Sequence, residues 1–282
     1  MPGIRIVTDS TGYIPTELIR KYGIHVAPQT LIWGEETLRD GIDILPDAFY
    51  ERLKTASVMP TTSQATVAEF VEVYEKAVAE GRPVLAILIS SKLSGTISSA
   101  VQAKELVPAA QVEIIDSYAT SMAMGYQVLA AARAAEAGKG FADVVALARQ
   151  AVDKTGVVFV VDTLEFLHRG GRIGGAAKLL GTALNLKPVL ELREGRLEPV
   201  EKIRTKAKAV DRMLDIVEER VKGKPNLRLA AIQAGAKDEA RALLDKAVAR
   251  LQPIESMVVE ASPVVGTHAG PGTVGLAYCT DL

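Results

Sequence analysis

The first half of the chain alternates short apolar runs with segments in which apolar residues recur at helical spacing. Strands are expected at residues 4–7, 84–89 and 112–116, where the apolar runs are unbroken. The clearest helix begins after Thr66, because Glu69 completes a capping box there. Further helices are expected from Pro15 and over residues 95–106, 119–137 and 141–155, the last of which Gly156 could terminate. This alternation favours a parallel, doubly wound α/β sheet.

The second half has a different pattern. Residues 188–203 alternate around Glu194-Gly195, which is typical of a β-hairpin. The helices expected here span 205–222 and 237–251, and the strands span 157–161, 227–234, 256–261 and 274–280. Helices and strands in this order indicate an α+β domain. We therefore predict an α/β domain over residues 1–156 and a closely packed α+β domain over residues 157–282.

One segment of the first half is ambiguous. Residues 25–33 are expected to be extended, but Pro28 argues against one uninterrupted central strand, because proline cannot donate to a sheet ladder.

Composition narrows the class of protein. The chain has 282 residues, of which 48% are hydrophobic and 24% charged, as in globular proteins. Its net charge of −1 indicates no general affinity for nucleic acid or acidic membranes, and we interpret Lys206 and Lys208 as solvated positions on a helix face. The N-terminus lacks the pattern of a signal peptide, and runs such as 157–161 are too short to span a bilayer, so a cytoplasmic protein is expected.

Neither disulfides nor metal ligands are expected. The single cysteine, Cys279, excludes an internal disulfide framework and a cysteine-rich zinc site. His25, His168 and His268 are scattered without metal-ligand spacing.

Hydroxyl-bearing residues follow three of the predicted strands. Residues 9–11 (Asp-Ser-Thr), 90–91 (Ser-Ser) and 116–117 (Asp-Ser) each come directly after an apolar run. The carboxyl ends of parallel strands lie at one edge of the sheet, where ligands bind. These segments, joined by the sequence TTSQ at 61–64, are therefore expected to meet at one mouth.

The function of these hydroxyls is open at this stage. Serine and threonine often cap helices and form turns, which is the structural interpretation for each of them. Thr62 and Ser94 lie in loops expected to open helices, where a helix N-terminus favours an anion. Neutral donors suit one carboxylate better than a polyphosphate.

Two glycine-rich stretches complete the candidate chemistry, FLHRGGRIGG at 166–175 and VVGTHAGPGTVG at 264–275. Neither is a dinucleotide fingerprint or a P-loop. Arg172 could reach an anion or serve a structural role, and His268, between what we interpret as turn-forming glycines, could be structural as well.

A hydrolase is the catalytic alternative. Ser94, Asp116 and His268 occur in an order conceivable for an acyl-ester hydrolase. A nucleophile elbow, however, should read GxSxG, and the local sequence KLSGT lacks the first glycine.

The ordered set of motifs resembles the DegV family of bacterial lipid-binding proteins. The motifs are VTDSTGYIP (7–15), TTSQ (61–64), ISSKLSGTISSA (89–100), DSYATSMAMG (116–125), FLHRGGRIGG (166–175), LKPVLELREG (186–195), KIRTKAKA (202–209) and GTHAGPGTVGLAY (266–278). One departure is His168-Arg169, where two basic residues are more usual before Gly-Gly-Arg.

The resemblance implies a long-chain fatty acid held between two α/β domains, without catalytic residues, metal or cofactor. It implies that Thr62 and Ser94 contact the carboxylate. The motifs that surround the head group contribute Arg172, His268, Thr61, Ser63 and Gly95. It also implies that the protein presents the acid to a separate fatty acid kinase, which forms acyl phosphate. A lipid-sensing regulatory protein would bind the same ligand and control a different protein.

The expected energetics agree with such a ligand. Each buried methylene contributes about 0.8 kcal/mol, so a tail with about 14 of them contributes roughly 11 kcal/mol before ordering costs. Each hydrogen bond to the charged head contributes only about 1.5–3 kcal/mol. The tail is therefore expected to dominate affinity and the hydroxyls to position the head group, although no motif reveals a tunnel for the tail.

Overall fold

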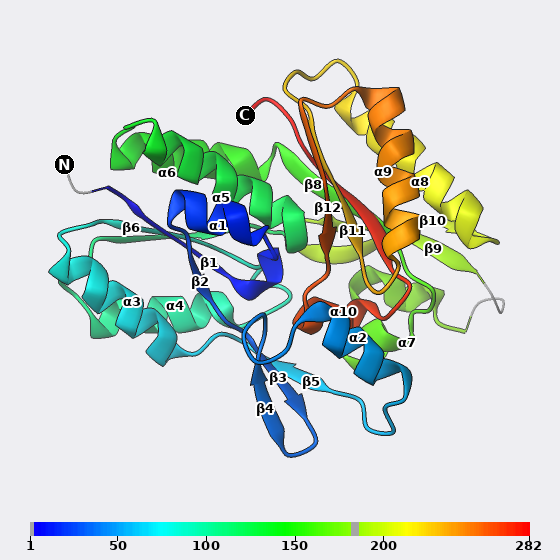
Figure 1. The fold of residues 1–282 in the computed structure, drawn as a ribbon, viewed down its shortest axis with the longest axis horizontal. Coiled ribbons are helices and arrows are strands. Elements are labelled where there is room, and N and C mark those ends of the chain that lie inside the picture. The colour runs from blue at the N-terminus through cyan, green and yellow to red at the C-terminus, as the bar shows by residue number, and fades with distance from the viewer. Residues whose placement is uncertain (1–2, 182–185) are drawn as a thin grey trace.

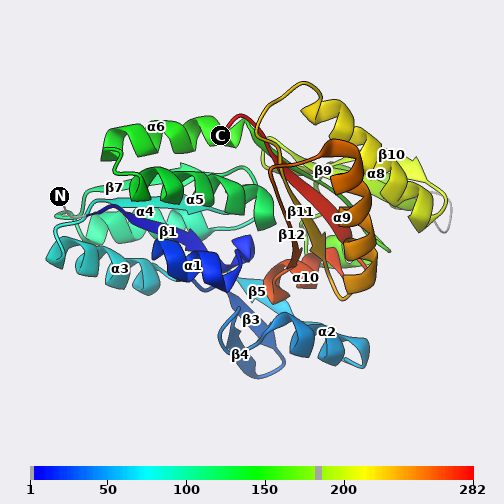
Figure 2. The same ribbon diagram turned by 45° about the horizontal axis from the view of Figure 1, so that its top comes forward.

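The computed structural model describes residues 3–181 and 186–282. The first sheet is parallel, in the order β2-β1-β6-β7. Its strands are β1 (Arg5–Asp9), β2 (His25–Ala27), β6 (Val84–Leu88) and β7 (Val112–Asp116). Helices α3 (Val67–Ala79) and α4 (Thr96–Leu106) cover one face, and α1 (Thr16–Tyr22), α5 (Ser121–Glu136) and α6 (Phe141–Val152) lie on the other (Figures 1 and 2). The predicted doubly wound parallel sheet is confirmed.

The second sheet is mixed and lies wholly in the second half of the chain, in the order β10-β9-β8-β13-β11-β12. Its strands are β8 (Thr155–Val160), β9 (Lys187–Arg193), β10 (Arg196–Ile203), β11 (Arg228–Gln233), β12 (Glu255–Glu260) and β13 (Val274–Cys279). Helices α8 (Lys206–Val221) and α9 (Lys237–Leu251) pack on it. The predicted hairpin is present, because Glu194 and Gly195 both adopt positive φ between β9 and β10.

Helix α5 joins the two sheets. It contacts β1 and β6 of the first sheet and β8 and β13 of the second (Figure 2). Nearly all of its first three turns is buried, as expected for a helix that is covered on every side. The two halves therefore share apolar packing, and the domain division near residue 156 remains a prediction.

A third, small sheet lies in the first half of the chain. It is antiparallel in the order β4-β3-β5, with strands β3 (Thr30–Trp33), β4 (Glu36–Arg39) and β5 (Thr61–Ser63). The extended segment 25–33 therefore divides between two sheets, and the break falls at Pro28 and Gln29. Helix α2 (Pro46–Lys54) lies between β4 and β5 in sequence and beside this sheet in space (Figure 1). Its Phe49 ring packs edge-on against Trp33 of β3.

The two interpretations that concern glycine positions are wrong. Gly156 does not end a helix: α6 ends at Val152, and Gly156 lies inside β8, where a Cβ atom would overlap the Tyr278 ring. His268 does not lie in a glycine turn but in helix α10 (Pro263–Ala269), whose Ser262 cap accepts a hydrogen bond from the Val265 amide.

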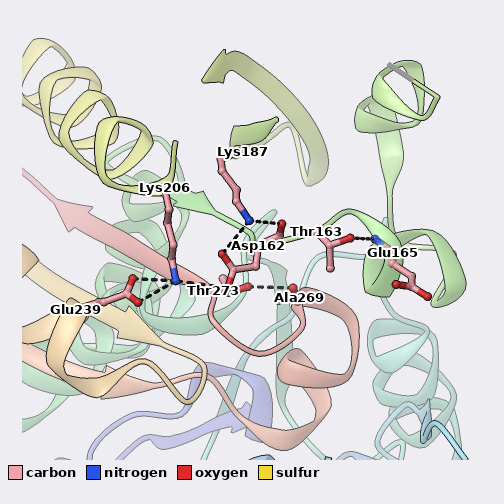
Figure 3. A network of polar contacts seen from close by, with 8 residues as sticks. All are labelled: Asp162, Thr163, Glu165, Lys187, Lys206, Glu239, Ala269 and Thr273. Carbon is pink, nitrogen blue, oxygen red and sulfur yellow. Dashed lines mark hydrogen bonds and ion pairs between the residues drawn. The ribbon is translucent and has the colours of Figure 1, made fainter. Parts of the chain in front are cut away.

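A charged cluster fixes the elements beside this helix (Figure 3). Lys187 donates to the Asp162 carbonyl at 2.8 Å. Lys206 Nζ lies 3.5 Å from Asp162 Oδ2 and 2.8 Å from Glu239 Oε2. Lys206 is therefore half-buried in an ion-pair network rather than solvated, whereas Lys208 is exposed. Among the helices that the structure describes, none has the length and apolarity needed to cross a membrane.

Candidate functional site

A cavity of about 110 Å³ lies between the two halves, well above the ~10–15 Å³ that one buried water needs. The first half contributes a largely polar set of lining residues: Thr11, Gln29, Thr62, Ser63, Gln64, Ile89, Leu93, Ser94, Thr120 and Ser121. The second half contributes mainly apolar residues, from β8, β9, β10, β11, β13 and α10, together with Arg172, His268 and Thr273. The cavity therefore combines an apolar wall with a group of hydroxyls.

Thr62 lies in strand β5 and not, as predicted, in a loop that opens a helix. Side chains alternate along a strand, so Thr62 is half-buried while Thr61 and Ser63 are exposed. Thr62 Oγ1 lies 2.8 Å from His268 Nε2, and this contact joins the two halves of the chain. Ser63 still lines the cavity edge, whereas Thr61 is not among the lining residues.

His268 is held as a neutral ring. Burial, together with the positive charge of Arg172, lowers the pKa of His268 from 6.5 to about 4. Its Nδ1 atom is buried without a hydrogen-bond partner among the described residues. Gly170 packs directly against the ring, because a Cβ atom there would overlap Nδ1 and lie 2.7 Å from Cε1. The glycine at 170 is thus required by close approach, since its φ of −74° is ordinary.

Arg172 ties the glycine-rich motif to the serine loop. Its Nε donates to the Leu93 carbonyl at 3.1 Å, and its Nη1 donates to the Gly170 carbonyl at 2.7 Å. The guanidinium therefore lies beside Ser94 and His268 and contributes positive charge to this end of the cavity.

Ser94 belongs to a chain of polar contacts. Its hydroxyl lies 2.9 Å from Thr96 Oγ1, which in turn accepts a hydrogen bond from Gln29 Nε2 at 3.2 Å. Gly95 precedes α4 without lining the cavity, and a Cβ atom there would lie 3.0 Å from the Gln64 amide. Small size at Gly95 thus lets the TTSQ segment approach the serine loop.

Several of the strand-end hydroxyls are hydrogen-bonded within the protein instead. Ser90 donates to the Gly195 carbonyl at 2.9 Å, and Ser117 donates to the Ala119 carbonyl at 3.1 Å. Ser10 donates to Asp40 Oδ2 at 2.7 Å. For these three residues the structural interpretation holds, because their protons are already donated to protein atoms.

Sequence reasoning missed other polar residues of the cavity wall. Gln29, which is 2% exposed, directly follows Pro28. Nothing in the local sequence marked it as a residue of a binding site. Thr120 and Ser121 lie at the start of α5, and their hydroxyls are buried without a partner in the part of the chain that the structure describes. They fall inside the motif DSYATSMAMG, so the motif indicated the segment without singling out these positions.

The geometry does not favour a hydrolytic triad. Ser94 Oγ pairs with Thr96, while His268 Nε2 pairs with Thr62. Asp116 accepts from the backbone amides of Ser91 and Tyr118. A triad needs the base to take the serine proton and an acid to orient the base. Within residues 3–181 and 186–282, no group of three or more His, Cys, Asp or Glu side chains could hold a metal ion.

Comparisons with known proteins agree with the fold. The family model described as "Uncharacterised protein, DegV family" matches residues 3–281. A DegV domain-containing protein of Clostridium perfringens is 36% identical over 282 residues, which are 99% of this chain and 99% of that protein.

Two solved structures are similar over the whole length. A DegV family protein from Thermus thermophilus, whose structure is described as showing fatty acid binding, has a TM-score of 0.94 at 37% identity. The match covers 99% of this chain and 100% of the Thermus chain. DegV of Bacillus subtilis, described as a fatty acid binding protein, has a TM-score of 0.92 at 33% identity, with 100% of both chains covered. The chain belongs to the DegV family.

Proposed function

We propose that this protein binds a long-chain fatty acid, with the carboxylate at Thr62 and Ser94 and the tail along the apolar wall. The observation that carries the proposal is the cavity between the two halves, in which neutral polar side chains and one cationic side chain adjoin a mainly apolar wall. The similar proteins of Thermus thermophilus and Bacillus subtilis are both described as binding fatty acids, which supports the same ligand class here.

The Thr62 hydroxyl is suited to donate to the carboxylate. Because His268 is neutral, one ring nitrogen carries a proton and the other does not. A proton on Nδ1 would be an unpaired buried donor, so the Nε2–H form is favoured. Nε2 then donates to Thr62 Oγ1 across their 2.8 Å contact, and the single Thr62 proton stays available for the ligand.

The tail would dominate affinity. The wall offers branched and aromatic side chains from several strands, such as Val157, Phe159 and Ile232. Each methylene buried against it contributes about 0.8 kcal/mol, against about 1.5–3 kcal/mol for each hydrogen bond to the head. Thr62 and Ser94 therefore determine where the carboxylate lies, and tail length determines how tightly the acid is held.

The proposed biochemical role is a noncatalytic carrier in the cytoplasm. The carboxylate would be presented to a separate fatty acid kinase, which supplies ATP and metal and forms acyl phosphate. A lipid-sensing role would use the same site with another protein partner. The two roles differ in whether the loaded protein supports acyl phosphate formation when it is mixed with a fatty acid kinase.

The ligand is tested by native mass spectrometry of protein purified under lipid-preserving conditions, followed by calorimetric titration of delipidated protein with palmitate. We expect a co-purified acyl mass and saturable binding. Ser94→Ala should weaken binding, whereas Ser98→Ala, exposed on α4, should not. Apoprotein alone, with no uptake of added fatty acid, would refute the proposal. Turnover of a chromogenic ester that Ser94→Ala abolishes would favour a hydrolase instead.

A further inference from the structure

A buried carboxylate lies behind the serine loop, outside the groups that we assign to the ligand. Asp9 is inaccessible to solvent and accepts four hydrogen bonds. Its Oδ2 accepts from the Ile89 amide at 2.7 Å, and its Oδ1 accepts from the Thr11 amide at 3.0 Å, the Thr11 hydroxyl at 2.6 Å and Gln29 Nε2 at 3.4 Å. The backbone amides of Ile89 and Thr11 can only donate, so both carboxylate oxygens of Asp9 serve as acceptors, although burial raises the pKa of this group.

This acceptor fixes the orientation of the Gln29 amide. Gln29 is 2% exposed, and only its NH₂ group can face an acceptor-only carboxylate. The two protons of that group have two acceptors, Asp9 Oδ1 and Thr96 Oγ1. The backbone amide of Gln29 also donates to Ser10 Oγ at 3.0 Å, which holds the residue at the break between β2 and β3.

The orientation continues through Thr96. Its hydroxyl is fully buried and already accepts from Gln29, so its own proton needs an acceptor. Ser94 Oγ lies 2.9 Å away and also accepts from the Thr96 amide at 3.3 Å. With the Thr96 proton donated to Ser94 Oγ, the proton of Ser94 is left for the cavity that this residue lines.

We propose that Gln29, oriented by Asp9, is a positioning residue that presets the Ser94 hydroxyl as a donor to the bound carboxylate. This inference rests on the proposed function, because it assigns a direction to one of its hydrogen bonds. Without Gln29, Thr96 Oγ1 has a free acceptor site, and Ser94 can donate its proton to Thr96 instead of to the ligand. This chain of hydrogen bonds from Asp9 through Gln29 and Thr96 to Ser94, here called the relay, occupies the acceptor site of Thr96 before the ligand arrives. It thereby lowers the free-energy cost of ordering the site on binding.

Gln29→Leu tests the relay, because leucine approximates the volume of glutamine and removes both donors. We expect the palmitate affinity of delipidated protein to fall roughly tenfold, which corresponds to about 1.4 kcal/mol. Ser94→Ala should then cause little further loss in the Gln29→Leu background. Affinity for the chain-matched primary alcohol should stay within about twofold of the wild type, because it places no carboxylate at Ser94. Gln102→Leu, exposed on α4, is the matched control.

A second variant separates orientation from simple structural damage. Adding Thr96→Val to Gln29→Leu removes the competing acceptor, so the double variant should bind palmitate more tightly than Gln29→Leu alone. If Gln29 were merely structural, the second substitution would lower affinity further, and that result overturns the inference. The inference is also overturned if Gln29→Leu leaves palmitate affinity unchanged while Ser94→Ala weakens it. In that case the proposed function still stands. If the wild type binds no palmitate, the proposed function itself fails.

Discussion

Gly170→Ala is the most specific perturbation of the head-group site, because it adds one methyl group and alters no hydroxyl. The backbone φ of −74° accepts alanine, so the substitution introduces no backbone strain. The new Cβ atom would overlap His268 Nδ1 and lie 2.7 Å from Cε1, whereas ordinary contact begins at 3.4 Å. The imidazole ring must therefore move by about 1 Å or more to restore normal carbon contact.

That movement removes the contact between His268 and Thr62. The two atoms are 2.8 Å apart, and hydrogen bonds weaken beyond about 3.2 Å. Once Nε2 withdraws, the Thr62 hydroxyl loses its orienting donor and no longer directs its proton to the carboxylate. A hydrogen bond to a charged group contributes about 1.5–3 kcal/mol, so the dissociation constant for a fatty acid should rise roughly 10- to 150-fold.

The assay is calorimetric titration of delipidated protein with palmitate and with the chain-matched alcohol. Gly170→Ala should weaken the acid much more than the alcohol. Gly140→Ala serves as control, because its φ is −65° and the nearest atom to an added Cβ is 3.6 Å away. Wild-type affinity for palmitate in a folded Gly170→Ala protein would refute the assignment of Thr62 and His268 to the head group.

Three further outcomes follow from the same geometry. Thr62→Ala should weaken palmitate binding in titrations, while Thr61→Ala should leave it nearly unchanged, because the two side chains leave β5 on opposite faces; equal losses would contradict this placement. Since the pKa of His268 is lowered to about 4 in the folded state, the unfolded chain binds the extra proton first as the pH falls. Denaturant unfolding of lipid-free protein should therefore lose up to about 3 kcal/mol between pH 6.5 and 4, a loss absent from His268→Gln. Lys206→Met should lower the unfolding temperature, measured by calorimetry, by roughly 2–4 °C, and Lys208→Met should leave it unchanged. The difference between the two variants should shrink at high salt. Identical unfolding temperatures would show that the ion pairs of Lys206 contribute no net stability.

The sequence predicts the elements whose signal is local. The run at 84–89 has no polar interruption, and the N-cap of the predicted capping box is present, with the Glu69 amide donating to the Thr66 hydroxyl at 3.2 Å. Helix α2 also carried local signals, Pro46 near its start and apolar residues at Phe49 and Leu53, yet it was not predicted. Its apolar face is short, and loop-like residues surround it.

The remaining elements depend on contacts that a single pattern does not contain. Strand β5 is three residues long, and it exists because it pairs with β3, about thirty residues earlier in the chain. Helix α10 contains Gly266 because a Cβ atom there would overlap the Tyr50 hydroxyl and lie 2.9 Å from Phe49 Cε1. Glycine selected for close packing resembles glycine selected for a turn, which is why the segment around His268 was misinterpreted.

The two hydroxyls of the proposed head-group site depend on different parts of the molecule. Ser94 is oriented by Thr96 and Gln29, which both belong to the first half of the chain. Thr62 is oriented by His268 across the interface, so its donor direction depends on how the halves are placed. A change in that placement would therefore release one hydrogen bond to the carboxylate and keep the other. Because the tail supplies most of the affinity, the acid could remain bound while its head group becomes less constrained.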